Sequence, residues 1–156
     1  MHTFSFRYSF SQLFSVPADE AYRWCTDYRP DDHALMGVRG KRRIHRVSDD
    51  TLILTDKTYQ DKTPVVKEKL VRLDPVQHSW TATYLSGPNK YSQFLYKITS
   101  RGPNASALEF IGLQVNESKT KVAPEEVAAI TRKVRDEDAE VWKLLALALE
   151  KELGTL

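Results

Sequence analysis

The sequence predicts an α+β fold in which a curved, seven-stranded antiparallel sheet wraps around a long C-terminal helix, with two short helices between the first two strands. Three observations predict it. Aromatic and polar side chains alternate near the N-terminus, six more strand-like runs follow between turn signals, and the apolar spacing becomes helical after residue 124. The length of 156 residues suits one domain, expected over 1–156.

The first predicted strand covers 4–16, because its apolar side chains fall on even positions. They are Phe4, Phe6, Tyr8, Phe10, Phe14 and Val16, and serines and an arginine occupy most of the odd positions. A period of two sends alternate side chains to opposite faces of a strand. Gln12 and Leu13 interrupt the pattern, which indicates a bulge that bends the strand.

Two short helices are predicted next. One runs over 17–25, with Pro17 in its first turn and acidic residues near its N-terminus, where the helix dipole stabilises negative charge. The other covers 31–36 and ends at Gly37, a residue typical of helix C-termini.

Six further strands are predicted, separated by short polar connections. Their expected ranges are 40–48, 51–59, 64–73, 78–86, 91–101 and 105–117. Turn signals such as Gly87-Pro88-Asn89 separate them. Because the connections are short, neighbouring strands are expected to form antiparallel hairpins. An interior glycine such as Gly112 lets a long sheet curl.

From Pro124 the apolar residues recur at spacings of three, four and seven, which predicts an amphipathic helix. Thirty residues of helix would span about 45 Å. The acidic cluster at 135–138 resembles a helix start, so a continuous helix and a break at this cluster both stay open. A continuous helix would turn Asp138 toward the sheet and raise its pKa, whereas a break, which the cluster favours, would leave it solvated.

The element order, the amphipathic last helix and the step from Phe14-Ser15-Val16-Pro17-Ala18 to Trp24 and Asp27 resemble the START-like (SRPBCC) superfamily, which has the helix-grip fold. The resemblance covers essentially the whole chain. Members include lipid and sterol transfer domains, aromatic polyketide cyclases, hormone receptors, pollen allergens, ubiquinone-binding proteins and co-chaperone activators, so the fold does not define the function. The connection at 49–50 lacks the glycine-rich loop of the pollen-allergen and hormone-receptor branch.

One helix cannot fill the concave side of a strongly curled sheet, so the sequence predicts a cavity lined by apolar and aromatic side chains. The candidate ligand-binding residues are Trp80, Tyr84, Phe94, Tyr96, Phe110, Val134, Asp138, Val141 and Leu145. Buried tyrosine hydroxyls need partners, which makes Tyr84 and Tyr96 candidate donors to a ligand. The aromatic residues fit cavity lining and ordinary core packing equally well.

The sequence has no phosphate-binding glycine loop, no zinc-type cysteine or histidine pairing and no nucleophile elbow. Asp31, Asp32 and His33 form the one compact cluster of ligand-type residues. Adjacent residues rarely converge on a metal, so the two acids are interpreted as helix caps. We therefore expect no metal and no cofactor.

Basic residues crowd the second predicted strand, at Arg39, Lys41, Arg42, Arg43 and Arg46. They alternate between both faces, which favours an outer or edge strand kept soluble by cations over a nucleic-acid interface. An arginine that pointed inward would be placed to bind a ligand carboxylate or phosphate. The net charge of +2 indicates no nucleic-acid partner.

No apolar run approaches the roughly 20 residues of a membrane span, and the first residues lack a signal-peptide pattern. Cys25 is the only cysteine, which is typical of a reducing compartment. A cytoplasmic location without stable membrane insertion is therefore expected.

The favoured function is the binding or transport of a hydrophobic small molecule, such as a lipid, sterol, quinone or polyketide-like ring, without chemistry. One alternative is an enzyme of the polyketide cyclase or aromatase type, in which Asp138, Tyr84, Tyr96 and His78 are the first candidates for proton transfer. A second alternative is a protein-interaction module that uses the basic strand or the charged half of the last helix.

Overall fold

The computed structural model describes residues 1–154, apart from the side chain of Gln60. Its elements confirm the predicted order. They are β1 (His2–Phe14), α1 (Ala18–Cys25), α2 (Asp32–Leu35), β2 (Gly40–Arg46), β3 (Thr51–Gln60), β4 (Thr63–Asp74), β5 (Ser79–Tyr84), β6 (Gln93–Ser100), β7 (Ser106–Ser118) and α3 (Pro124–Glu152).

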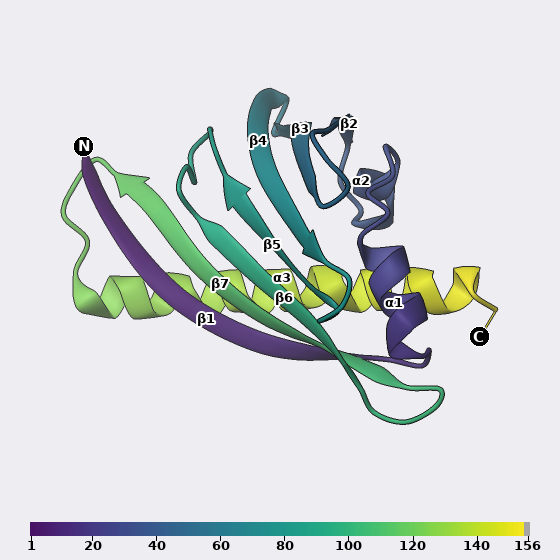
Figure 1. Ribbon diagram of the computed structural model, residues 1–156. Helices are drawn as coiled ribbons and strands as arrows, with labels where there is room; N and C mark the ends of the chain where they lie inside the picture. The colour runs from purple at the N-terminus through teal and green to yellow at the C-terminus, as the bar shows by residue number, and fades with distance from the viewer. Residues whose placement is uncertain (155–156) are drawn as a thin grey trace.

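The seven strands form one antiparallel sheet in the order β1-β7-β6-β5-β4-β3-β2. The sheet curves, and α3 crosses its concave side, with α1 and α2 near the C-terminal end of α3 (Figure 1). This arrangement confirms the predicted α+β class. The edges of the sheet are β1 and β2, so the basic strand is an edge strand, as predicted.

The pairing of β1 keeps one register along its whole length, so the predicted bulge at Gln12 and Leu13 is wrong. β1 pairs with β7 residue for residue, with Gln12 opposite Leu108 and Leu13 opposite Ala107. The alternation continues through both positions, because Phe14 is buried and Leu13 is 67% exposed. Leu13 is an apolar side chain on the solvent face, where single exposed leucines are common.

The C-terminal helix is continuous from Pro124 to Glu152, so the break that the acidic cluster favoured is wrong. No glycine or proline interrupts it after its first residue, and its charged residues pair along the surface, with Lys133 Nζ 4.0 Å from Glu137. Asp138 is therefore not in a solvated first turn. It lies in mid-helix and is half-buried.

The core lies between the concave face of the sheet and the helices. Its most completely buried apolar side chains are Phe14, Val16, Leu52, Leu54, Val71, Leu108 and Leu149. On α3 the buried residues are Ala146 and Leu149, both in its C-terminal half. The middle of α3 packs less completely, and this is where space remains beneath the sheet. Within residues 1–154, no helix combines the length and apolar character needed to cross a bilayer.

Candidate ligand-binding cavity

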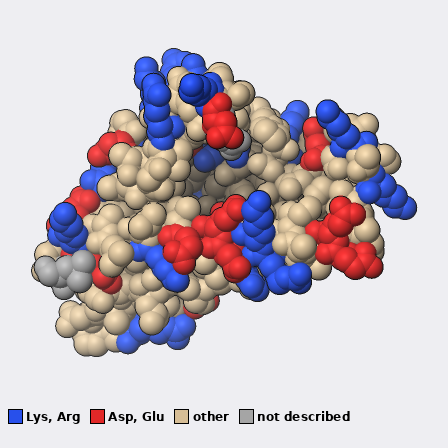
Figure 2. All heavy atoms as spheres, turned by 180° about the vertical axis from the view of Figure 1, so that it is seen from behind, with Lys and Arg blue, Asp and Glu red and all other residues tan. Residues whose placement is uncertain are grey.

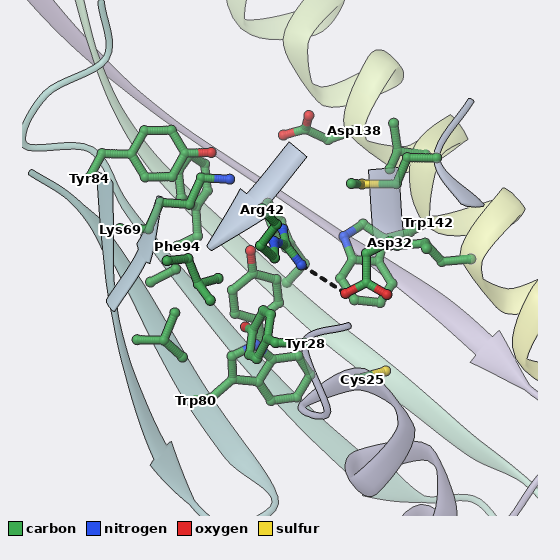
Figure 3. A pocket seen from close by; sticks show the side chains of 18 of the residues that line it. Cys25, Tyr28, Asp32, Arg42, Lys69, Trp80, Tyr84, Phe94, Asp138 and Trp142 are labelled. Carbon is green, nitrogen blue, oxygen red and sulfur yellow. Dashed lines mark hydrogen bonds and ion pairs between the residues drawn. The ribbon is translucent and has the colours of Figure 1, made fainter. Parts of the chain in front are cut away.

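A cavity of about 250 Å³ lies between the sheet, the middle of α3 and the segment that carries α1 and α2. Figure 2 shows the hollow on the α3 side of the molecule, and Figure 3 shows the side chains around it. Its lining includes the aromatic residues Trp24, Tyr28, Trp80, Tyr84, Phe94, Tyr96, Phe110 and Trp142 and the polar residues Asp32, Arg42, Lys69, Asn89, Gln114 and Asp138.

The structure gathers the candidate residues of the sequence analysis around this cavity, with one exception. Trp80, Tyr84, Phe94, Tyr96, Phe110, Asp138, Val141 and Leu145 all line it. Val134, one helical turn before Asp138, packs against the core cluster and is not part of the lining. That the lining residues bind a ligand stays a prediction.

A ladder of aromatic rings forms the floor of the cavity. Trp80 lies opposite Tyr96, and Tyr96 opposite Phe110, in the strand register. Trp80 and Tyr96 stack with their centroids 4.6 Å apart and an interplanar angle of 1°, and Phe110 meets Tyr96 edge to face at 5.2 Å. Such contacts between rings fix their orientation, so the floor is rigid.

Two tyrosine hydroxyls of the lining have no hydrogen-bond partner among the described residues. They belong to Tyr84 and Tyr96, and both residues line the cavity. Burial raises the pKa of Tyr96 well above its ordinary value, so its hydroxyl stays protonated and able to donate. These hydroxyls are therefore free to contact a bound molecule.

A buried carboxylate organises the charged wall of the cavity. Asp56 is 2% exposed and accepts hydrogen bonds from Arg42 Nε at 2.7 Å, Arg42 Nη2 at 3.0 Å and Lys69 Nζ at 2.8 Å. Burial alone would raise the pKa of Asp56, but hydrogen bonds from His33 and Arg42 and the charges of Lys69 and Arg42 hold it well below its usual range. Asp56 is thus ionised and fixes both cations.

The same arginine ties α2 to the edge strand. Arg42 Nη1 donates to Asp32 Oδ2 at 2.8 Å, and its guanidinium lies 5.5 Å from the Tyr28 ring centroid. Burial raises the pKa of Asp32, and the charge of Arg42 opposes that rise. The expectation of an inward-pointing arginine is met by Arg42, whose side chain is 5% exposed, but two carboxylates balance its charge. Arg42 is therefore not part of a basic outer surface.

A second acidic group enters the cavity from α3. Tyr8 Oη donates to Asp138 Oδ2 at 2.5 Å and lies 3.3 Å from Gln114 Oε1. The Tyr8 ring occupies the space above Gly112, its partner across the strands, where any Cβ would collide with the ring. Burial raises the pKa of Asp138, with Glu137 adding to it and Tyr8 and Lys67 opposing it. Asp138 is therefore a candidate for proton transfer as well as for binding.

The remaining proton-transfer candidate lies elsewhere. His78 Nε2 is 3.0 Å from Asp19, and its ring packs against Tyr22 with the centroids 5.3 Å apart. It is absent from the cavity lining, so it does not join Asp138. Among residues 1–154, no three His, Cys, Asp or Glu side chains gather in a way that would hold a metal ion.

Sequence reasoning missed Lys69, which lines the cavity, and Asp56 and Tyr8, which hydrogen-bond to the lining residues Lys69 and Asp138. Asp56 was not a candidate, although it lies on the same inward side of its strand as Leu52 and Leu54. The available signal was the position of Asp56, which is an acidic residue where the alternation of the strand calls for a buried apolar one. A buried carboxylate needs a charged or hydrogen-bonding partner. Trp24, Cys25, Tyr28 and Met36 come from α1 and the irregular segments after it, where no period indicates which side chains point inward.

No family model and no curated protein matches the sequence. Solved structures match its fold. Zhui aromatase/cyclase from a Streptomyces species aligns with a TM-score of 0.79 at 11% identity, covering 96% of each chain. Norcoclaurine synthase from Thalictrum flavum, in complex with dopamine and hydroxybenzaldehyde, aligns at 0.64 and 15% identity over 95% of this chain and 88% of that one. A third match, from Mycobacterium smegmatis, aligns at 0.65 and 17% identity over 96% of this chain and 97% of that one.

Proposed function

We propose that this chain, which has the helix-grip fold of the START-like superfamily, binds a small hydrophobic aromatic molecule between its sheet and α3. One observation carries the proposal. The stacked rings of Trp80 and Tyr96, with Phe94 and Phe110 beside them, face a space of about 250 Å³ that no side chain fills. An apolar cavity with a few polar groups is the usual form of a small-molecule site.

The size of the cavity narrows the class of ligand. At about 30 Å³ for each water molecule, its volume corresponds to roughly eight waters. Pockets for drug-sized ligands hold about 300–1,000 Å³. A compound of one or two fused rings therefore fits this cavity better than a sterol or a two-chain lipid.

The tryptophans supply a direct assay. The chain has three, Trp24, Trp80 and Trp142, and all of them line the cavity. Titration with naphthalene should give a saturable change in intrinsic fluorescence. The absence of a saturable change with naphthalene or its derivatives would contradict the proposal.

Two substitutions on β5 locate the binding. Ala82 is buried and lines the cavity, so Ala82→Leu fills the space without removing a contact. Thr81 is its neighbour on the opposite face of the strand, so Thr81→Leu is the matched control. Ala82→Leu should weaken naphthalene binding about tenfold or more, the equivalent of about 1.4 kcal/mol. Equal affinities for the two variants would show that the compound binds outside the cavity.

A second candidate function is an enzyme of the cyclase or aromatase type. One observation favours it: two titratable groups, Asp138 from α3 and Lys69 from β4, both line the cavity. In one cavity a carboxylate can remove a proton next to a carbonyl, and an ammonium can stabilise the resulting oxygen anion. Protein-dependent deuterium uptake at the methyl group of acetylnaphthalene, abolished by Asp138→Asn, would support this function. Uptake equal to that in buffer would argue against it.

A further inference from the structure

Two polar groups in the cavity lining keep hydrogen-bonding capacity that the protein does not use. Lys69 Nζ donates to Asp56 Oδ2 at 2.8 Å, and its other N–H groups have no acceptor among the side chains that the structure describes. Asp138 accepts the Tyr8 hydroxyl through Oδ2, and its Oδ1 has no partner within the same residues. The ammonium, which lies 5.0 Å from the Tyr84 ring centroid, and the carboxylate of Asp138 border the same space (Figure 3).

The charges around this space balance. Two cations and two carboxylates line it: Arg42 and Lys69, and Asp32 and Asp138. A ligand with a full charge would leave one buried charge without a partner, which is costly in a site of low polarity. The balance therefore favours a ligand that is neutral overall.

A neutral ligand can still match the two groups if it is dipolar. The ammonium of Lys69 only donates hydrogen bonds, and an ionised Asp138 only accepts them. A carbonyl oxygen of the ligand can accept from Lys69, and a hydroxyl of the ligand can donate to Asp138. Hydrogen bonds to charged groups are stronger than those between neutral groups. The rings of Trp80, Tyr96 and Phe110 line the same cavity and offer aromatic contacts to a ligand ring.

We propose that the cavity selects a neutral, flat aromatic molecule that carries a carbonyl acceptor toward Lys69 and a hydroxyl donor toward Asp138. This inference rests on the proposed function and adds the polarity and the orientation of the ligand. In the reverse orientation the hydroxyl oxygen would still accept from Lys69, but the carbonyl oxygen would face the Asp138 carboxylate, so that pair would consist of two acceptors.

A series of naphthalenes tests the inference on the unmodified protein. Acetylnaphthol carries a ketone and a hydroxyl on opposite rings, acetylnaphthalene only the ketone, naphthol only the hydroxyl, naphthalene neither, and hydroxynaphthoate a carboxylate in place of the ketone. Acetylnaphthol should bind about tenfold more tightly than either singly substituted compound, because each matched hydrogen bond adds affinity. Hydroxynaphthoate should bind at least about tenfold more weakly than acetylnaphthol, because its charge has no free partner.

Two substitutions test the orientation. Asp138→Asn should weaken the binding of naphthol and acetylnaphthol and leave acetylnaphthalene unchanged. Lys69→Met keeps the apolar part of the side chain. It should weaken the binding of acetylnaphthol and acetylnaphthalene, which carry the ketone, and leave the binding of naphthol unchanged. Naphthalene binding, measured on both variants, reports whether the cavity is still formed, so a merely structural effect would lower the affinity for every compound.

The failure of the inference is distinguishable from the failure of the proposed function. If naphthalene binds but acetylnaphthol binds no more tightly, or if hydroxynaphthoate binds most tightly, the dipolar ligand is wrong and the binding function stands. If Asp138→Asn weakens acetylnaphthalene as much as naphthol, the assigned orientation is wrong. If none of the compounds binds to the unmodified protein, both proposals fail.

Discussion

Replacement of Asp56 by asparagine should destabilise the protein severely, although the two side chains have nearly the same shape. Asp56 is 2% exposed and accepts three charge-assisted hydrogen bonds, two from Arg42 and one from Lys69. Its loss would leave two buried or half-buried cations with less than their full complement of negative charge. Removal of one partner from a buried ion pair costs about 3–5 kcal/mol.

The expected loss lies at the lower end of that range, at about 3 kcal/mol. Asp32 still pairs with Arg42 at 2.8 Å, and the asparagine carbonyl still accepts one hydrogen bond. A loss of this size is a large part of the 5–15 kcal/mol by which a domain of this kind is usually stable. Urea unfolding followed by tryptophan fluorescence measures it, with Asp49→Asn, an exposed acid before β3, as the control.

The effect should depend on pH with a definite sign. The pKa of Asp56 in the folded protein lies below that in the unfolded chain, which is about 3.9. The stability that Asp56 contributes is therefore complete above about pH 3.9 and is lost as the pH falls toward the folded pKa. The gap between the unmodified protein and Asp56→Asn should shrink by about 1.4 kcal/mol for each pH unit below that point. A gap below about 1 kcal/mol at neutral pH, or one that did not change with acid, would refute the reasoning.

Three further substitutions should have distinct effects. Gly112→Ala places a Cβ in the Tyr8 ring, so it should lower the free energy of unfolding, measured in urea, by about 2 kcal/mol. It should also weaken the binding of compounds that carry a hydroxyl. Unchanged stability would contradict the contact between Gly112 and Tyr8. Leu149→Ala removes a fully buried side chain and should lower the free energy of unfolding by about 3 kcal/mol. Leu147 is 54% exposed, so Leu147→Ala should change that free energy by less than about 0.5 kcal/mol. Equal losses in the two variants would contradict the packing of Leu149 in the core. Burial raises the pKa of Asp138 in the folded state, so the unmodified protein should lose stability relative to Asp138→Asn as the pH rises from about 4 to 8. A difference in Tm between the two proteins that stays constant with pH would contradict the raised pKa.

The elements were predictable from the sequence because each depends on a local period. The even-numbered aromatic residues of β1 and the three- and four-residue spacing of α3 hold in the structure. The two wrong predictions share a cause. The bulge at Gln12 and Leu13 and the break at 135–138 each gave a few local side chains more weight than the pattern that continues around them. Leu13 is exposed on the outer face of the sheet, and Asp138 is held by Tyr8.

The charged wall of the cavity depends on strand register, which the sequence does not specify. Arg42 lies opposite Asp56, and Lys69 reaches the same carboxylate from the next strand. The contact between Tyr8 and Asp138 joins residues 130 positions apart through the angle at which α3 crosses the sheet. The volume of the cavity depends on that angle and on packing, so patterns predicted the presence of the cavity but not its size or polarity.

The position of a bound compound tests the central claim most directly. Intermolecular NOEs from the ring protons of bound acetylnaphthol to isotopically labelled protein report which side chains lie within a few ångströms of it. The cavity predicts contacts with Trp80, Phe94 and Phe110. Contacts confined to Leu144 and Leu147, which are exposed on α3, would contradict the account, because the compound would then bind to the surface and not beneath the sheet.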